Sequence, residues 1–201
     1  MRPLPHVPIE PADDRELLGR LARGDGSALT QLTARHGQRL VNFLHHAGPD
    51  PSWAEDLLQE LLVRIQLHAD RYDPRYPAIV WMLRIARNLA TDLCRRERSR
   101  SRAKDRLAER LEGRDATGPD PFGAAADREF EEALHAALQE LGEEIRTAFV
   151  LREIEGMNYT EIAQILGTNE KTVSSRLSRA RARLRDRLRD HMDSEATEEG
   201  S

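Results

Sequence analysis

The chain has 201 residues and a formal net charge of −4, so it is not a globally basic nucleic-acid-binding protein. Charged residues make up 33% of it and aromatic residues only 4%, a composition that favours helices with charged faces over an aromatic-rich β-sandwich. The single cysteine, Cys94, excludes an internal disulfide and offers no metal-ligand spacing, which fits a reducing cytoplasmic environment.

The chain opens with residues 1–12, which contain four prolines and no apolar run. We expect a disordered leader there, neither a signal peptide nor a membrane span, and no direct membrane insertion. A first helix is predicted at residues 13–23, where leucines gather on one side before Gly24. Either Asp25 or Ser27 then caps a second, longer helix.

A third helix is predicted after Ser52, which forms a capping-box pattern with Glu55 three residues later. Its expected buried stripe consists of five apolar residues: Leu57, Leu58, Leu61, Leu62 and Ile65. Three polar residues fall on another face, where exposure to solvent is the ordinary interpretation: Asp56, Gln59 and Glu60.

A turn-rich loop at residues 71–77 precedes a fourth helix that begins at Ala78. This helix becomes basic towards its end, because residues 95–114 carry nine basic and four acidic side chains. From residue 99 to residue 126 the apolar periodicity is lost and glycine and proline accumulate, which predicts a linker between two domains.

The predicted fold is therefore all-α, with two small helical domains on a flexible joint. We place the first domain at residues 13–98, the linker at 99–126, the second domain at 127–190 and an acidic tail at 191–201. Amphipathic helices are expected at the start of the second domain, before its most distinctive motif.

That motif is a helix-turn-helix. Ala163 is followed by Gly167 and then, six residues later, by Val173. Both helices also have candidate capping residues. These are Asn158 or Thr160 for the first helix and Thr168 or Asn169 for the second. Such a motif places its second helix in the major groove of DNA, with N-terminal side chains at base edges. The candidate contacts with bases and phosphates are Asn169, Glu170, Lys171, Thr172, Ser174, Ser175, Arg176 and Arg179. The basic residues that follow are too many for one groove, so some are ordinary solvated charges.

Three segments, in this order, carry a family resemblance: AEDLLQELLVRIQLHADRYDP, WMLRIARNLATDLCRRER and YTEIAQILGTNEKTVSSRLSRARARL. They resemble bacterial sigma factors of the sigma-70 family, in particular the extracytoplasmic function (ECF) group, which keeps only regions 2 and 4. The resemblance covers residues 13–98 and 127–189. It implies a transcription initiation factor that brings core RNA polymerase to the −10 and −35 promoter elements and assists promoter opening.

The resemblance also assigns roles to residues. It implies that the third helix docks on the clamp coiled coil of the polymerase β′ subunit through Asp56, Gln59 and Glu60, and that the β subunit is a further contact. It implies that the −10 element is bound by Tyr72, Tyr76, Arg84, Arg87, Asn88, Arg95 and Arg96, and that the −35 element is bound by the helix-turn-helix residues given above. Before the pair Thr172 and Val173 the family often has a small residue or glycine, whereas this chain has Lys171 there, preceded by Glu170. An anti-sigma factor is a further partner that we infer from the resemblance.

Other interpretations remain open at the level of sequence. One is a freestanding helix-turn-helix regulator that binds operator DNA, and another is an adaptor that binds proteins through its helices. An enzyme has least support, since we find no glycine-rich phosphate loop, no paired catalytic carboxylates and no cofactor motif. We expect no metal site either, because the adjacent His45 and His46 should point about 100° apart on a helix, and His68 is remote in sequence.

Overall fold

A computed structural model describes the backbone of residues 13–108 and 125–198, and the side chains of residues 13–101 and 130–189. Every element in these parts is helical, as predicted. The predicted leader and most of the predicted linker lie outside the described residues. Among the helices that are described, none is both long and apolar enough to cross a membrane.

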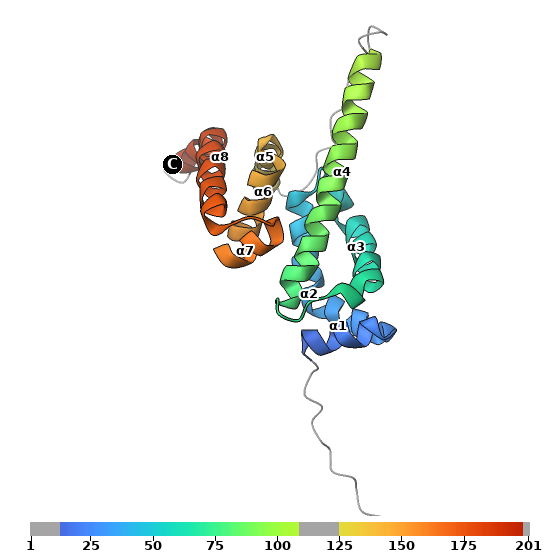
Figure 1. Cartoon of the computed structure of the whole chain (residues 1–201). Coiled ribbons are helices and arrows are strands. Elements are labelled where there is room, and N and C mark those ends of the chain that lie inside the picture. Colours follow the sequence, from blue (N-terminus) through green and yellow to red (C-terminus); the bar gives the residue numbers. More distant parts are fainter. Residues whose placement is uncertain (1–12, 109–124, 199–201) are drawn as a thin grey trace, which may run out of the picture.

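Four α-helices build the first domain: α1 (Asp14–Ala22), α2 (Gly26–Ala47), α3 (Ala54–His68) and α4 (Ala78–Ala108). Their apolar stripes meet around Leu17, Phe43 and Leu61, which are completely buried. The second half of α4 projects well beyond this bundle (Figure 1). This projecting part is the basic stretch without apolar periodicity, and arginine, lysine and alanine favour a helix even where nothing packs against them.

One sequence prediction needs correction here. Asp50, not Ser52, organises the start of the third helix, because its carboxylate accepts hydrogen bonds from the backbone N–H (2.9 Å) and the hydroxyl (2.7 Å) of Ser52. The hydroxyl of Ser52 is thereby occupied, a 3₁₀ turn, η1 (Pro51–Trp53), precedes α3, and α3 begins without a side-chain cap. In addition, α4 extends to Ala108, beyond the domain end predicted at residue 98.

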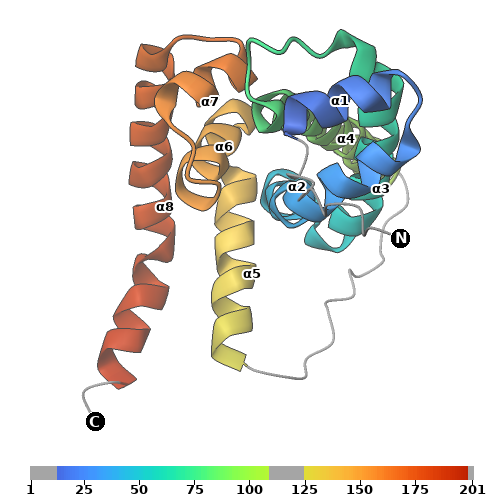
Figure 2. The same cartoon turned by 90° about the horizontal axis from the view of Figure 1, so that it is seen from below.

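The second domain contains α5 (Ala125–Glu140), α6 (Glu143–Phe149), the π-helical turn η3 (Val150–Ile154), α7 (Tyr159–Leu166) and α8 (Glu170–Glu198). Helices α5 and α8 lie side by side (Figure 2) and enclose a small core around Leu138, Ala180 and Leu184. Because α8 continues to Glu198, it includes most of the residues predicted as the acidic tail.

The helix-turn-helix has the caps that the sequence indicates. Asn158 and Glu161 form a capping box at the start of α7, and Gly167 ends α7 in the left-handed conformation at φ 64°. Asn169 then accepts a hydrogen bond from the backbone N–H of Thr172 at 2.9 Å and so caps α8. Val173 is fully buried against α7, which fixes the angle between the two helices.

The two domains also pack on each other. Helices α2 and α4 contact α6, η3 and α7, and one apolar cluster is continuous across the boundary. Polar contacts accompany it: Arg39 of α2 forms an ion pair with Glu155 (2.9 Å), and Gln139 of α5 donates a hydrogen bond to the carbonyl of Gly48 (2.6 Å). The side chain of Arg146 is completely buried and donates to the sulfur of Cys94 at 3.0 Å.

Candidate nucleic-acid interface

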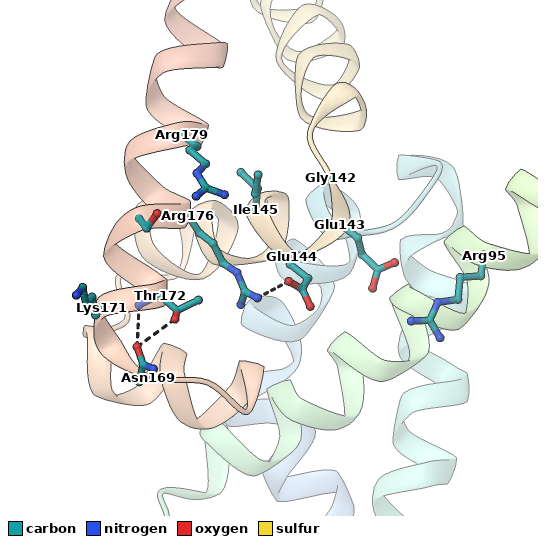
Figure 3. Close-up of a pocket in the computed structure, with 11 residues that line it drawn as sticks. Arg95, Gly142, Glu143, Glu144, Ile145, Asn169, Lys171, Thr172, Arg176 and Arg179 are labelled. Carbon is teal, nitrogen blue, oxygen red and sulfur yellow. Dashed lines mark hydrogen bonds and ion pairs between the residues drawn. The ribbon is translucent and has the colours of Figure 1, made fainter.

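The exposed end of the helix-turn-helix is the start of α8. Lys171, Ser174, Ser175 and Arg179 are all exposed there, on the first turns of the helix that would enter a major groove. Lys171 and Arg179 both line a hollow between α8 and α6, where Lys171 points away from α6 and Arg179 points towards Ile145 (Figure 3). The structure therefore leaves this half of the predicted set available to DNA.

Most of the other predicted residues near the start of α8 form hydrogen bonds or ion pairs within the protein. Asn169 is the helix cap, and its side-chain oxygen also accepts from the hydroxyl of Thr172 at 3.1 Å. Glu170 accepts a hydrogen bond from the hydroxyl of Thr160 at 2.6 Å, which links α8 to α7. Arg176 is mostly buried and forms an ion pair with Glu144 of α6. These contacts connect the start of α8 to α7 and α6.

Glu144 is a residue that sequence reasoning missed. It lies 32 positions before Arg176, and no local pattern indicates that α6 supplies a carboxylate to the recognition helix. Arg95 of the first domain borders the same hollow, across from Glu143 (Figure 3). The hollow therefore brings a predicted −10 contact and the predicted −35 contacts to one region of the packed molecule.

The aromatic residues predicted for the −10 element have different surroundings. Tyr72 packs edge to face on Trp81, with ring centroids 5.6 Å apart, and its hydroxyl donates to the carbonyl of Tyr76 at 2.7 Å. Burial raises the pKa of the Tyr72 phenol, so this hydroxyl remains protonated. Tyr76 is 38% exposed. Of the two predicted tyrosines, Tyr76 therefore has the ring that is more available for stacking on a base.

Along α4, Arg84, Asn88 and Arg95 are exposed and share one face, and Arg96 is exposed beside them. Arg87 differs, because it is half-buried and donates a hydrogen bond to the carbonyl of Ile165 in α7 at 3.0 Å. Arg84 and Gln164 of α7 line a common small pocket. In this arrangement α7 lies against part of the predicted −10 surface.

The predicted polymerase contacts lie on the solvent face of α3. Asp56, Gln59 and Glu60 are exposed, opposite the buried stripe. Two apolar residues on the same face are exposed as well, Val63 at 55% and Leu67 at 68%. Sequence reasoning missed them, although their spacing of seven and eleven residues from Asp56 places them on its face. The α3 face thus combines charge with unpaired apolar surface, as protein-binding faces do.

The three histidines are not arranged as predicted. The rings of His45 and His46 meet edge to face, with centroids 4.7 Å apart, so the expectation that they point apart is wrong. Side-chain torsions turn two adjacent imidazoles towards each other even though their Cα–Cβ bonds diverge. Glu131 of α5 joins them, whereas His68 does not belong to this cluster.

Comparison with known proteins decides between the open interpretations. The family model of sigma-70 region 2 matches residues 32–100, and that of sigma-70 region 4 matches residues 131–184. The chain belongs to the sigma-70 family. It is 34% identical over 187 residues to the ECF RNA polymerase sigma factor SigE of Mycolicibacterium smegmatis, an alignment that covers 91% of this chain and 72% of SigE.

Two solved structures resemble the whole arrangement. One is CnrH in complex with the cytosolic domain of CnrY, with a TM-score of 0.66, 30% identity, and coverage of 88% of this chain and 97% of CnrH. The other is the sigma factor RpoE in complex with the anti-sigma factor NepR from Bartonella quintana, with a TM-score of 0.56, 26% identity, and coverage of 80% and 96%. This sigma factor of the ECF group is therefore a promoter-directing transcription initiation factor, and the freestanding regulator is not favoured.

Proposed function

We propose that the two domains of this sigma factor read the two promoter elements through the surfaces described above. In this proposal α8 enters the major groove of the −35 element, and the exposed face of α4, with Tyr76, binds the −10 strand. Lys171 and Arg179 supply charge to bases or phosphates, while Arg84, Arg95 and Arg96 position the strand through its phosphates. Asn88 has an amide that both donates and accepts, so it suits a base edge.

We further propose that the exposed face of α3 docks on the β′ clamp coiled coil of core polymerase. Asp56 and Glu60 would orient the approach to a basic partner, because exposed charge pairs contribute more to orientation than to binding energy. Val63 and Leu67 would supply the apolar area that binding requires, since their side chains leave water when the coiled coil covers them.

One observation carries the mechanism: Arg87 on the predicted −10 surface donates to α7 of the other domain. A promoter strand cannot approach Arg87 while α7 occupies its guanidinium. The packed form is therefore a resting form, and engagement of both promoter elements requires the domains to separate. Polymerase favours separation if it binds the separated form more tightly than the packed one.

We also infer an anti-sigma partner for this chain. Two solved structures with the same architecture are complexes of a sigma factor with another protein, CnrY in one case and the anti-sigma factor NepR in the other. A partner that binds the packed form would keep α7 against α4 and so keep Arg87, one part of the −10 surface, engaged.

The test is transcription in vitro with bacterial core polymerase and fragmented genomic DNA from the source organism. We expect new transcript starts that depend on this protein and share two spaced upstream motifs. Tight DNA binding without polymerase, and no dependent starts, would contradict the proposal.

The residue assignments are tested in the same assay by paired variants. Asp56→Arg should weaken core binding, whereas Glu55→Arg, on the adjacent position about 100° around α3, should not. Equal losses in both variants would show that general acidity of α3, and not this face, governs docking.

A further inference from the structure

The end of α2 and the start of α5 bring three metal-ligating side chains together. His45 and His46 belong to the last turn of α2, and Glu131 belongs to α5. Their ligand atoms all lie within 4.8 Å of one another. This cluster spans the boundary between the two domains, and its hollow is also lined by Glu55 at the start of α3.

The chemistry of the three groups suits a divalent transition metal. Two imidazole nitrogens and one carboxylate oxygen are a set that zinc accepts, with metal–ligand distances of about 2.0 to 2.2 Å. Ligand atoms of a tetrahedral zinc ion lie roughly 3.3 Å apart, so modest rotations of these partly exposed side chains suffice. All three side chains also line a common hollow, which leaves room for an ion.

His135 lies on α5 as well, but it does not belong to the three-residue group, and its Nε2 atom contacts the side-chain nitrogen of Gln139 at 3.2 Å. It follows Glu131 by one helical turn and is therefore on the same face of α5. Its Nδ1 atom is buried and has no hydrogen-bond partner among the described residues.

We propose that His45, His46 and Glu131 bind a zinc-type divalent ion, and that this ion fastens the two domains to each other. Separation of the domains would divide the ligands between α2 and α5 and destroy the site. The ion therefore binds the packed form preferentially, and mass action makes it stabilise that form. At a free metal concentration of 100 times the dissociation constant, the ratio of packed to separated protein rises about 100-fold.

The site has a regulatory consequence, which rests on the proposed function. Because α7 engages Arg87 and so covers part of the predicted −10 surface in the packed form, an ion that stabilises this form opposes promoter recognition. The sigma factor would then respond directly to the availability of a transition metal.

Metal binding itself is tested with the metal-stripped full-length chain. Co²⁺ should bind at a ratio of 1:1 with the visible absorption of a tetrahedral site, and Zn²⁺ should displace it. Glu131→Gln and His46→Gln should each weaken binding at least tenfold, whereas Glu132→Gln, the neighbouring exposed carboxylate, should not. Absence of saturable binding, or equal affinity in Glu131→Gln and Glu132→Gln, would overturn the site. Circular dichroism checks that each variant is folded.

The fastening of the domains is tested by small-angle scattering, independently of any activity. The test uses a chain in which Arg39→Ala weakens packing by removing the ion pair with Glu155. Zn²⁺ should reduce the radius of gyration of this chain and of the same chain with Glu132→Gln, but not with Glu131→Gln. Binding without this compaction would overturn the joining role.

In the transcription assay, Zn²⁺ should reduce output with the parent chain more than with Glu131→Gln, which also controls for effects of zinc on polymerase. Equal inhibition of both would overturn the regulatory consequence. A parent chain that supports no specific starts even without zinc would instead count against the proposed function.

Discussion

The two candidate DNA surfaces differ in whether residues of the other domain contact them. At the start of α8, Lys171 and Arg179 are exposed and the helix is held by its own cap and by Glu144. On α4, in contrast, Arg87 is engaged by the carbonyl of Ile165 in the other domain. The first surface is ready for its ligand and the second is partly covered. Recognition of the −35 element can therefore precede recognition of the −10 element.

The largest expected effect comes from the exposed surface. Replacement of both Lys171 and Arg179 with alanine should lower the affinity of the free protein for its −35 element by about 100-fold, since each contact contributes roughly 1 to 3 kcal/mol. Fluorescence anisotropy at several salt concentrations measures this loss, and the salt dependence should become less steep.

The matched control replaces Arg183 and Arg185, two exposed arginines farther along α8, with alanine. This pair removes the same charge and should change affinity far less. Equal losses in the two double variants would mean that α8 acts only as a general positive charge.

A second substitution should make the two surfaces more alike by exposing the part of α4 that contacts α7. Arg39→Ala leaves the carboxylate of Glu155, whose side chain is 2% exposed, without its ion-pair partner. Loss of a partner from a buried pair is costly, and because Arg39 is itself 37% exposed we expect about 2 kcal/mol, or a roughly 30-fold shift towards separated domains. Small-angle scattering should show a larger radius, and single-stranded −10 DNA should bind more tightly.

The second substitution Glu155→Gln should partly restore packing in the Arg39→Ala background, because it removes the unpaired charge and keeps a similar shape. No restoration would show that packing of Arg39, and not its charge, holds the domains together.

The same contact predicts a smaller, pH-dependent effect. Burial raises the pKa of Glu155 above its ordinary value of 4.5, although the hydrogen bond from Arg39 opposes this. The packed form therefore binds a proton at Glu155 more tightly than the separated form does. This stabilisation of the packed form by protonated Glu155 is fully present below pH 4.5 and is lost as pH rises through the raised pKa. Scattering between pH 4 and pH 8 should show more separation of the domains at the higher pH. The Glu155→Gln variant should lack this dependence.

The smallest expected effect shows whether Asn169 only caps α8 or also contacts DNA. Asn169→Ala should destabilise the second domain by about 1 kcal/mol, measured by urea unfolding, because Thr172 loses its acceptor. Asn169→Ser keeps a capping oxygen and should retain both stability and promoter affinity. A loss of affinity in Asn169→Ser with normal stability would show that the amide contacts DNA.

Local signals explain what the sequence predicted well. The caps and Gly167 define the helix-turn-helix because each acts within a few residues. Two neighbouring capping residues explain the wrong prediction of the cap of α3. The hydroxyl of Ser52 donates to Asp50 and so is not available to cap α3. Val63 and Leu67 could have been found by extending the helical spacing from Asp56.

The contacts between domains could not be predicted in this way. Arg39 and Glu155 are 116 residues apart, and neither residue has a neighbouring pattern that indicates the other. The meeting of His46 and Glu131 likewise depends on how α2 and α5 pack. Such contacts are consequences of the tertiary arrangement, and a single sequence has no periodicity that encodes them.

Arg146 gives the packed form one more property. Among the described residues its guanidinium has only uncharged partners, Cys94 and Gln139 among them, and it is completely hidden from solvent. When the domains separate, this guanidinium becomes hydrated and adds a positive charge to the surface of the second domain. A charge on the surface acts over about 10 Å at moderate ionic strength and increases the rate of encounter with a polyanion. Separation would thus make the second domain a faster partner for DNA as well as uncovering the first.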